Sequence, residues 1–148
     1  MPEITTTIEI DDSADHVWEI LTDFERYAEW NPRTRIDGSP TVGSVLEVSP
    51  GPDAGRIPTF RPRVLVADGR ELRWLGHLYV RGLFDGEHRF TIEELPDDRS
   101  RLVHSERFTG LLAGGLLRLI GRDTEAGFEA VNAALRDRAE STADRAAD

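Results

Sequence analysis

The chain has 148 residues, a length that favours a single domain around one core. Its 28 acidic residues outnumber its 18 basic residues, all of them arginine, and the resulting net charge of -10 disfavours binding to nucleic acid or to an anionic membrane. The absence of cysteine excludes disulfides and cysteine-ligated metal or iron–sulfur sites.

The composition and the first residues also indicate where the protein works. An acidic, lysine-free surface is typical of proteins adapted to high salt, although a codon bias towards arginine gives the same composition. The start MPEITTTIEI has neither the basic nor the apolar region of a signal peptide, and the longest apolar run, LLAGGLL, is too short to cross a membrane. We therefore expect a cytoplasmic protein without membrane insertion.

The first elements are a strand and one or two short helices. Residues 3–10 alternate between isoleucine and polar side chains, which predicts a half-buried strand. Asp12 or Ser13 can then cap a helix, whose apolar residues recur at helical spacing as far as Phe24. Pro32 ends this region, which is either one helix or two helices with a break near Asp23.

The middle of the chain reads as strands and turns, and its end reads as a helix. The segment 49–58, SPGPDAGRIP, is too rich in proline and glycine for a regular element and suits a mobile loop. From about Leu111 the apolar residues return to helical spacing, and the tail from about residue 140 is expected to fray. The predicted strands are 33–38, 44–49, 59–67, 71–80, 84–95 and 100–109.

These elements predict an α+β fold in which an antiparallel sheet has one apolar face to cover. The C-terminal helix is the only predicted element long enough to cover that face. A strongly curved sheet that wraps one helix tends to leave a space between the two layers. We expect a binding site in that space.

The hairpin 84–109 places polar side chains on this inward face. With its turn at Asp97, Ile92 lies opposite Leu102, Phe90 opposite His104, and His88 opposite Glu106. Glu106 can then hold the His88 imidazole in one tautomer. His88, Glu106 and His104 either form the polar end of an apolar pocket, with His88 and Glu106 as candidate catalytic residues, or satisfy one another without a ligand.

The facing residues of the preceding hairpin are predicted in the same way, with its turn at Asp68 and Gly69. Trp74 points inward as a stacking wall for a ligand or as a core residue. Gly76 and Gly86 interrupt strands, which indicates bulges or space kept clear beside the backbone. The expected opposite pairs are Val66 with Leu72, Val64 with Trp74, and Pro62 with Gly76.

The remaining candidates are mostly apolar. Asn132 can donate a hydrogen bond into the cavity or lie at its edge in water. Two histidines and one glutamate are suitable zinc ligands, but they match no HExxH pattern, so we expect no metal and no cofactor. The expected ligand-binding residues are Trp30, Trp74, Phe84, His88, Phe90, His104, Glu106, Phe108, Leu116, Ile120 and Phe128.

Several stretches together resemble one family over nearly the whole chain. They are ITTTIEIDDSADHVWEILTDFERYAEWNP, ELRWLGHLYVRGLFDGEHRFTIEEL, RLVHSERFTG and FEAVNAALRDRAE. The chain is similar to the SRPBCC, or START-like, superfamily and within it to the polyketide cyclase/dehydrase-like branch. This resemblance implies the helix-grip fold: two short helices after the first strand, and a curved antiparallel sheet of six to seven strands around the C-terminal helix and a deep apolar cavity.

Three functions remain open, because members of this superfamily differ in activity. The first is binding of a small hydrophobic or lipid-like molecule between the sheet and the C-terminal helix by residues 1–148 as one domain. The second is a cyclase/dehydratase-like enzyme that uses His88 as a base oriented by Glu106. The third is a co-chaperone-like interaction module. The oxygenase branch is excluded because the chain lacks its cysteine-ligated iron–sulfur motif.

Overall fold

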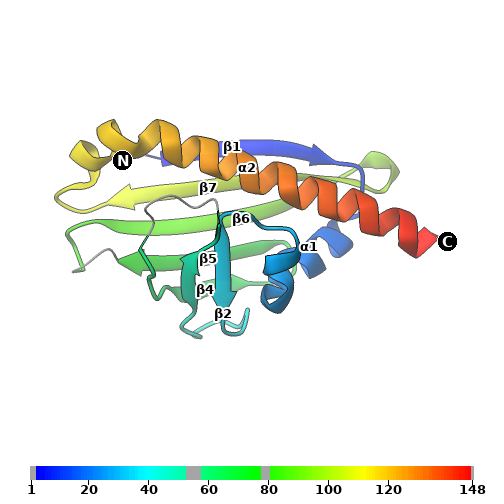
Figure 1. Cartoon of the computed structure of the whole chain (residues 1–148), viewed down its shortest axis with the longest axis horizontal. Coiled ribbons are helices and arrows are strands. Elements are labelled where there is room, and N and C mark those ends of the chain that lie inside the picture. Colours follow the sequence, from blue (N-terminus) through cyan, green and yellow to red (C-terminus); the bar gives the residue numbers. More distant parts are fainter. Residues whose placement is uncertain (1–2, 53–57, 78–80, 148) are drawn as a thin grey trace.

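The long C-terminal helix lies along one face of an antiparallel sheet (Figure 1). This computed structural model describes residues 3–52, 58–77 and 81–147, with side chains as far as residue 143. The sheet has five strands in the order β1-β7-β6-β5-β4. Their bounds are β1 (Glu3–Ile10), β4 (Arg63–Ala67), β5 (Glu71–His77), β6 (Asp85–Leu95) and β7 (Arg99–Thr109).

The other two strands, β2 (Thr34–Asp37) and β3 (Glu47–Pro50), form a separate two-stranded sheet. Isolated bridges from Val45 to Arg63 and from Val48 to Phe60 join it to the chain around β4. The α+β helix-grip fold is therefore confirmed, with the seven described strands divided between a sheet of five and a sheet of two.

The strand expected at 59–67 begins only at Arg63. Pro58 and Pro62 lack the N–H group that a regular ladder needs, so Phe60 makes only an isolated bridge. Residues 53–57 of the expected loop and residues 78–80 of the expected strand 71–80 lie outside the described residues.

Two short helices follow β1, as the reading with a break at Asp23 predicted. Ser13 caps α1 (Ala14–Thr22) by accepting a hydrogen bond from the His16 amide, and the 3-10 helix η1 (Phe24–Glu29) begins after Asp23. The buried Tyr27 hydroxyl donates to the Leu21 carbonyl and joins the two helices. Burial, together with the charge of Asp23, raises the pKa of Tyr27 well above its usual value, so the phenol stays neutral.

Helix α2 (Ala113–Ala147) has two unlike parts. Its packed half, residues 128–139, presents buried side chains at helical spacing: Phe128, Val131, Asn132, Leu135 and Ala139. In its exposed half, residues 113–127, Leu119 remains 80% exposed and Ile120 39% exposed. No helix within the described residues combines the length and apolar character needed to span a membrane.

The main core lies under the packed half and includes Leu72, Ile92, Leu102 and Leu135. A second, smaller cluster of Phe84, Phe108 and Ala113 lies at the start of α2, with Leu116 packed against it. The two clusters occupy opposite ends of the inner face of the sheet. The polar candidates lie between them.

Candidate functional site

The β6–β7 hairpin has the register that the sequence predicted. His88 pairs with Glu106, Phe90 with His104, and Ile92 with Leu102. The turn between the strands contains Asp97 at φ 64°, a left-handed conformation that aspartate tolerates better than most residues. The imidazoles and the carboxylate therefore lie on the inner face of the sheet.

A continuous polar chain crosses this face. Asn132 of α2 contacts Thr6 Oγ1 of β1 at 2.8 Å through Nδ2 and His104 Nδ1 at 2.8 Å through Oδ1. His104 Nε2 lies 2.6 Å from His88 Nε2, and His88 Nδ1 lies 3.4 Å from Glu106 Oε1. We call these five residues, Thr6, Asn132, His104, His88 and Glu106, the relay.

His104 is the most enclosed ionisable group of the relay, with 2% of its surface exposed. Burial and the nearby charge of His88 lower the pKa of His104 well below its ordinary value of 6.5, against a smaller opposing effect of the Asn132 hydrogen bond. His104 is therefore neutral at physiological pH and has one N–H donor and one acceptor nitrogen.

Aromatic rings pack against both imidazoles. Trp74 stacks on His88 with ring centroids 5.0 Å apart, and Phe128 stacks on His104 at 4.2 Å. Phe90 lies between them, 4.9 Å from His88 and 4.3 Å from His104. Trp74 is thus a buried core residue that orients His88.

The two strand glycines keep space clear, as one of the sequence readings proposed. A Cβ atom at Gly86 would collide with Glu106 Oε2, so this glycine lets the carboxylate lie over the β6 backbone. At Gly76 a Cβ atom would lie 3.1 Å from the Phe60 ring. Neither glycine marks a bulge, because the register irregularity of this region lies between Val64 and Val66 of β4.

This bulge makes one predicted pairing wrong. Val64 lies opposite Trp74 as expected, but Leu72 pairs with Ala67 and Val66 pairs with Arg73. An extra residue on β4 shifts the register by one, which strict alternation does not reveal. The predicted pair of Val66 with Leu72 is therefore not formed.

The structure brings together part of the predicted ligand-binding set. Phe84, Phe108 and Leu116 meet in the small cluster at the start of α2. Trp30 packs its ring on Tyr27 at a centroid distance of 4.8 Å, in the main core. Ile120 lies exposed on α2.

Thr6 is a relay member that the sequence analysis did not name, and Asn132 is one that it left open. Thr6 occupies an inward position in the alternation of Ile4, Ile8 and Ile10, and it pairs with His104 across β1 and β7. A hydroxyl at an inward position of an otherwise apolar strand was the signal that could have identified it.

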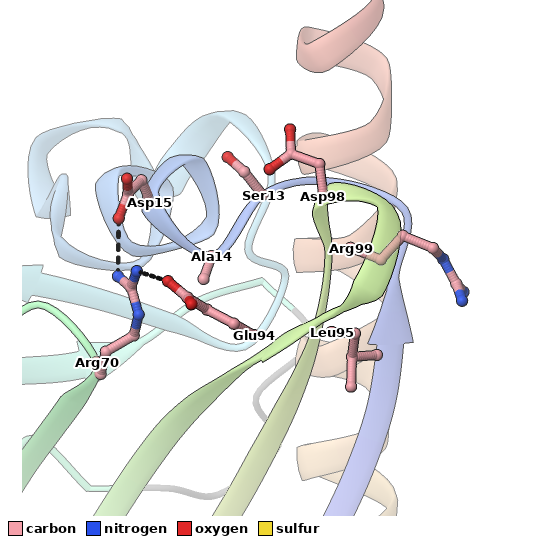
Figure 2. Close-up of a pocket in the computed structure, with 8 residues that line it drawn as sticks. All are labelled: Ser13, Ala14, Asp15, Arg70, Glu94, Leu95, Asp98 and Arg99. Atoms are coloured by element: carbon pink, nitrogen blue, oxygen red, sulfur yellow. Dashed lines mark hydrogen bonds and ion pairs between the residues drawn. The ribbon is translucent and has the colours of Figure 1, made fainter.

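Two surface pockets lie away from His88 and Glu106. In the first, of about 210 Å³, Arg70 lies between Asp15 and Glu94 (Figure 2). Arg70 donates to Asp15 at 2.8 Å and pairs with Glu94, so its charge is already compensated. The lining residues are Ser13, Ala14, Asp15, Arg70, Glu94, Leu95, Asp98 and Arg99.

The second pocket, of about 370 Å³, lies between β1 and α2 and contains the Thr6 end of the relay. Its lining residues are Thr5, Thr6, Thr7, Ile8, Glu125, Glu129 and Asn132. Neither pocket is the apolar cavity that the sequence led us to expect. Within the described residues, no group of three or more His, Cys, Asp or Glu is placed to hold a metal ion.

The comparisons with known proteins agree with this architecture. A family model described as polyketide cyclase/dehydrase and lipid transport matches residues 1–145. The ZhuI aromatase/cyclase from Streptomyces sp. R1128 is 22% identical, with a TM-score of 0.74 over 94% of this chain and 93% of that chain. No curated protein sequence matches.

Two further solved structures share the fold. A START superfamily protein from Mycobacterium smegmatis is 21% identical, with a TM-score of 0.70 over 95% of this chain and 98% of that chain. Norcoclaurine synthase from Thalictrum flavum is 14% identical, with a TM-score of 0.71 over 95% of both chains. At these identities the likeness establishes the fold alone.

Proposed function

Because the chain belongs to the polyketide cyclase/dehydrase and lipid transport family, we propose that it binds a small hydrophobic or lipid-like molecule between the sheet and α2. The observation that carries this proposal is the position of the His88–Glu106 pair. It lies on the apolar inner face, with 13% and 19% of the two side chains exposed, beside the small cluster at the start of α2. A polar group at the edge of an apolar surface can orient one end of such a ligand.

We place the ligand against the exposed half of α2. Phe90 and Phe128 contact the His104 ring at 4.3 and 4.2 Å, and with 2% of its surface exposed His104 is not directly accessible to a ligand. The ligand therefore lies against Phe84, Phe108, Leu116 and Ile120, with its polar end at Glu106. Trp74, Phe90, His104 and Phe128 support His88 from the opposite side, and Trp30, which packs on Tyr27, is not part of this surface.

Fluorescence of the neutral dye N-phenyl-1-naphthylamine tests this placement. We expect the dye to bind the wild-type protein, and Leu116→Glu to weaken binding about tenfold or more, because a carboxylate next to the ligand loses its hydration. The matched control is Leu65→Glu, which adds the same charge at an exposed position of β4 and should change the affinity less than about twofold.

Native mass spectrometry of the purified protein provides an independent test. A small molecule retained by the wild-type protein and lost from Leu116→Glu supports the proposal. Absence of both a retained molecule and dye binding would contradict it. Equal dye binding by Leu116→Glu and Leu65→Glu would show that the dye binds elsewhere on the chain.

A cyclase/dehydratase-like activity is the second candidate, favoured by the contact between His88 and Glu106 at 3.4 Å. In this role His88 is the general base and Glu106 orients it. With the retained molecule as substrate, His88→Ala should lower the rate by roughly two to four orders of magnitude. For a carrier, the same variant lowers affinity without any turnover to lose, and for an interaction module it changes neither property.

A further inference from the structure

The hydrogen bonds of the relay have a direction that begins at Thr6. The Thr6 hydroxyl donates its hydrogen to the His104 carbonyl at 3.2 Å, so towards Asn132 it only accepts. Asn132 must then present its NH2 group to Thr6 and its amide oxygen to His104 Nδ1, each at 2.8 Å. The backbone carbonyl of β7 thus determines the orientation of the amide.

The same reasoning continues through both imidazoles. An amide oxygen only accepts, so His104 Nδ1 carries a hydrogen. His104 is buried and neutral, hence its Nε2 has a lone pair and must accept from its neighbour. His88 Nε2 therefore carries a hydrogen, which it donates to His104 Nε2 across 2.6 Å.

One proton remains to be placed between His88 Nδ1 and Glu106 Oε1, which lie 3.4 Å apart. Two lone pairs facing each other would repel, so the contact is favourable when one hydrogen lies between the two atoms. The other oxygen, Glu106 Oε2, has no hydrogen-bond partner in the described part of the chain, and the side chain is 19% exposed. This oxygen lies over the β6 backbone at Gly86 and has the capacity to accept a hydrogen bond from a ligand.

Building on the proposed function, we infer that Glu106 Oε2 selects a ligand whose polar end is an uncharged hydroxyl, and that Asn132 is the positioning residue that determines which nitrogens of the two neighbouring imidazoles carry hydrogen. A hydroxyl donates to the free carboxylate oxygen. A ligand carboxylate or phosphate would instead face that oxygen with like charge. An ester or ketone would offer it a second acceptor.

The relay orients the site and does not carry protons away from it. Proton transfer along the chain would have to pass from His104 Nδ1 to the amide oxygen of Asn132, which is a very weak base. Proton transfer therefore stops at Asn132, and the second pocket does not serve as a proton entrance.

Nitrogen-15 NMR of the imidazoles tests the assignment without any ligand. The chain has only 4 histidines, so His88 and His104 can be assigned by substitution. We expect a hydrogen on His104 Nδ1, a bare His104 Nε2 and a hydrogen on His88 Nε2. A bare His88 Nε2 in the wild-type protein would overturn the inference.

Asn132→Asp should reverse the relay. A carboxylate at this position favours a hydrogen on both nitrogens of His104, so that Nε2 donates to His88 and the remaining His88 hydrogen moves to Nδ1. Thr6→Val, with Thr6→Ser as control, is a second variant in case Asn132→Asp does not fold. Loss of the Thr6 hydroxyl should broaden or shift the His104 Nδ1 signal, while Thr6→Ser preserves it. Unchanged tautomers in every folded variant would contradict the role of Asn132.

Three probes of similar shape test the ligand class: naphthalene, 2-naphthol and 2-naphthoate. We expect 2-naphthol to bind about tenfold tighter than naphthalene, since a hydrogen bond to a charged group contributes at least this factor. 2-Naphthoate should bind no better than naphthalene. Glu106→Gln removes the charge and should reduce both differences.

The outcomes separate this inference from the proposed function. If naphthalene binds and 2-naphthol gains nothing, or if 2-naphthoate binds best, the hydroxyl preference is wrong while the proposed function stands. If none of the three probes binds, the proposed function fails as well. The NMR measurement still decides the direction of the relay in that case.

Discussion

The two halves of α2 differ in what they contribute to the protein. In the packed half, Leu135 has no exposed surface and belongs to the main core, whereas in the exposed half Leu119 is 80% exposed. The sheet beneath changes in the same direction, from buried leucines to the partly exposed His88 and Glu106. One continuous helix therefore stabilises the fold with one end and leaves its other end exposed, where we propose that the ligand binds.

The largest expected effect comes from truncating one leucine in each half. Leu135→Ala should lower the free energy of unfolding by about 2 to 5 kcal/mol, because it leaves a cavity in the core. Leu119→Ala should cost less than about 0.5 kcal/mol, since its side chain is already in water. Urea denaturation measures both values. Similar losses would show that the two halves do not differ in packing.

The second effect is a pH dependence of the stability, which follows from the burial of His104 under the packed half of α2. The pKa of His104 is lowered in the folded state, so below about pH 6.5 the unfolded chain binds a proton that the folded protein does not. Stability should therefore fall as the pH falls below this value, by up to about 1.4 kcal/mol per pH unit.

Comparison of two histidine variants isolates this effect from the titration of the carboxylates. His104→Gln should be less stable at neutral pH but should lose less stability between pH 7.5 and 5.5. His77→Gln, at a partly exposed position that contacts Asp85, is the control for removing an imidazole, and the slope should fall more in His104→Gln than in this control. A wild-type slope in His104→Gln would mean that His104 is not the neutral group that the packed half encloses.

The smallest effect on stability is expected where the sheet faces the exposed half. Gly86→Ala forces the Glu106 side chain to move, and because its end is flexible the free energy of unfolding should change by less than about 1 kcal/mol. The preference for 2-naphthol over naphthalene should nevertheless fall to that of Glu106→Gln. Gly76→Ala, whose Cβ meets the Phe60 ring, is the control that should keep this preference.

The strands differ in how well the sequence predicts their register. The register of β6 and β7 was predictable, because strict alternation and a three-residue turn at Pro96–Asp98 leave few other pairings. The register of β4 was not, because the bulge between Val64 and Val66 depends on packing against β5. The alternation of apolar and polar residues does not reveal a local irregularity such as this bulge.

The candidate site was predicted only in part, for a similar reason. His88 and Glu106 are neighbours across one hairpin, so their contact follows from local register. Asn132 and Thr6 are 126 residues apart in the sequence, and their contact depends on how α2 packs on β1. The size of the space between sheet and helix depends on where large rings such as Phe128 and Trp74 pack, and a linear pattern does not determine this.

The pairing of the first strand with the last has a consequence for how the protein is made. β1 lies beside β7, with Glu3 opposite Arg107, so β1 leaves the ribosome long before its partner exists. Until then its isoleucines have no sheet to join, and contacts of such high sequence separation slow folding. We expect synthesis of this protein to be the stage at which it most needs chaperones, and loss of β1 to expose the edge of β7, which would then aggregate.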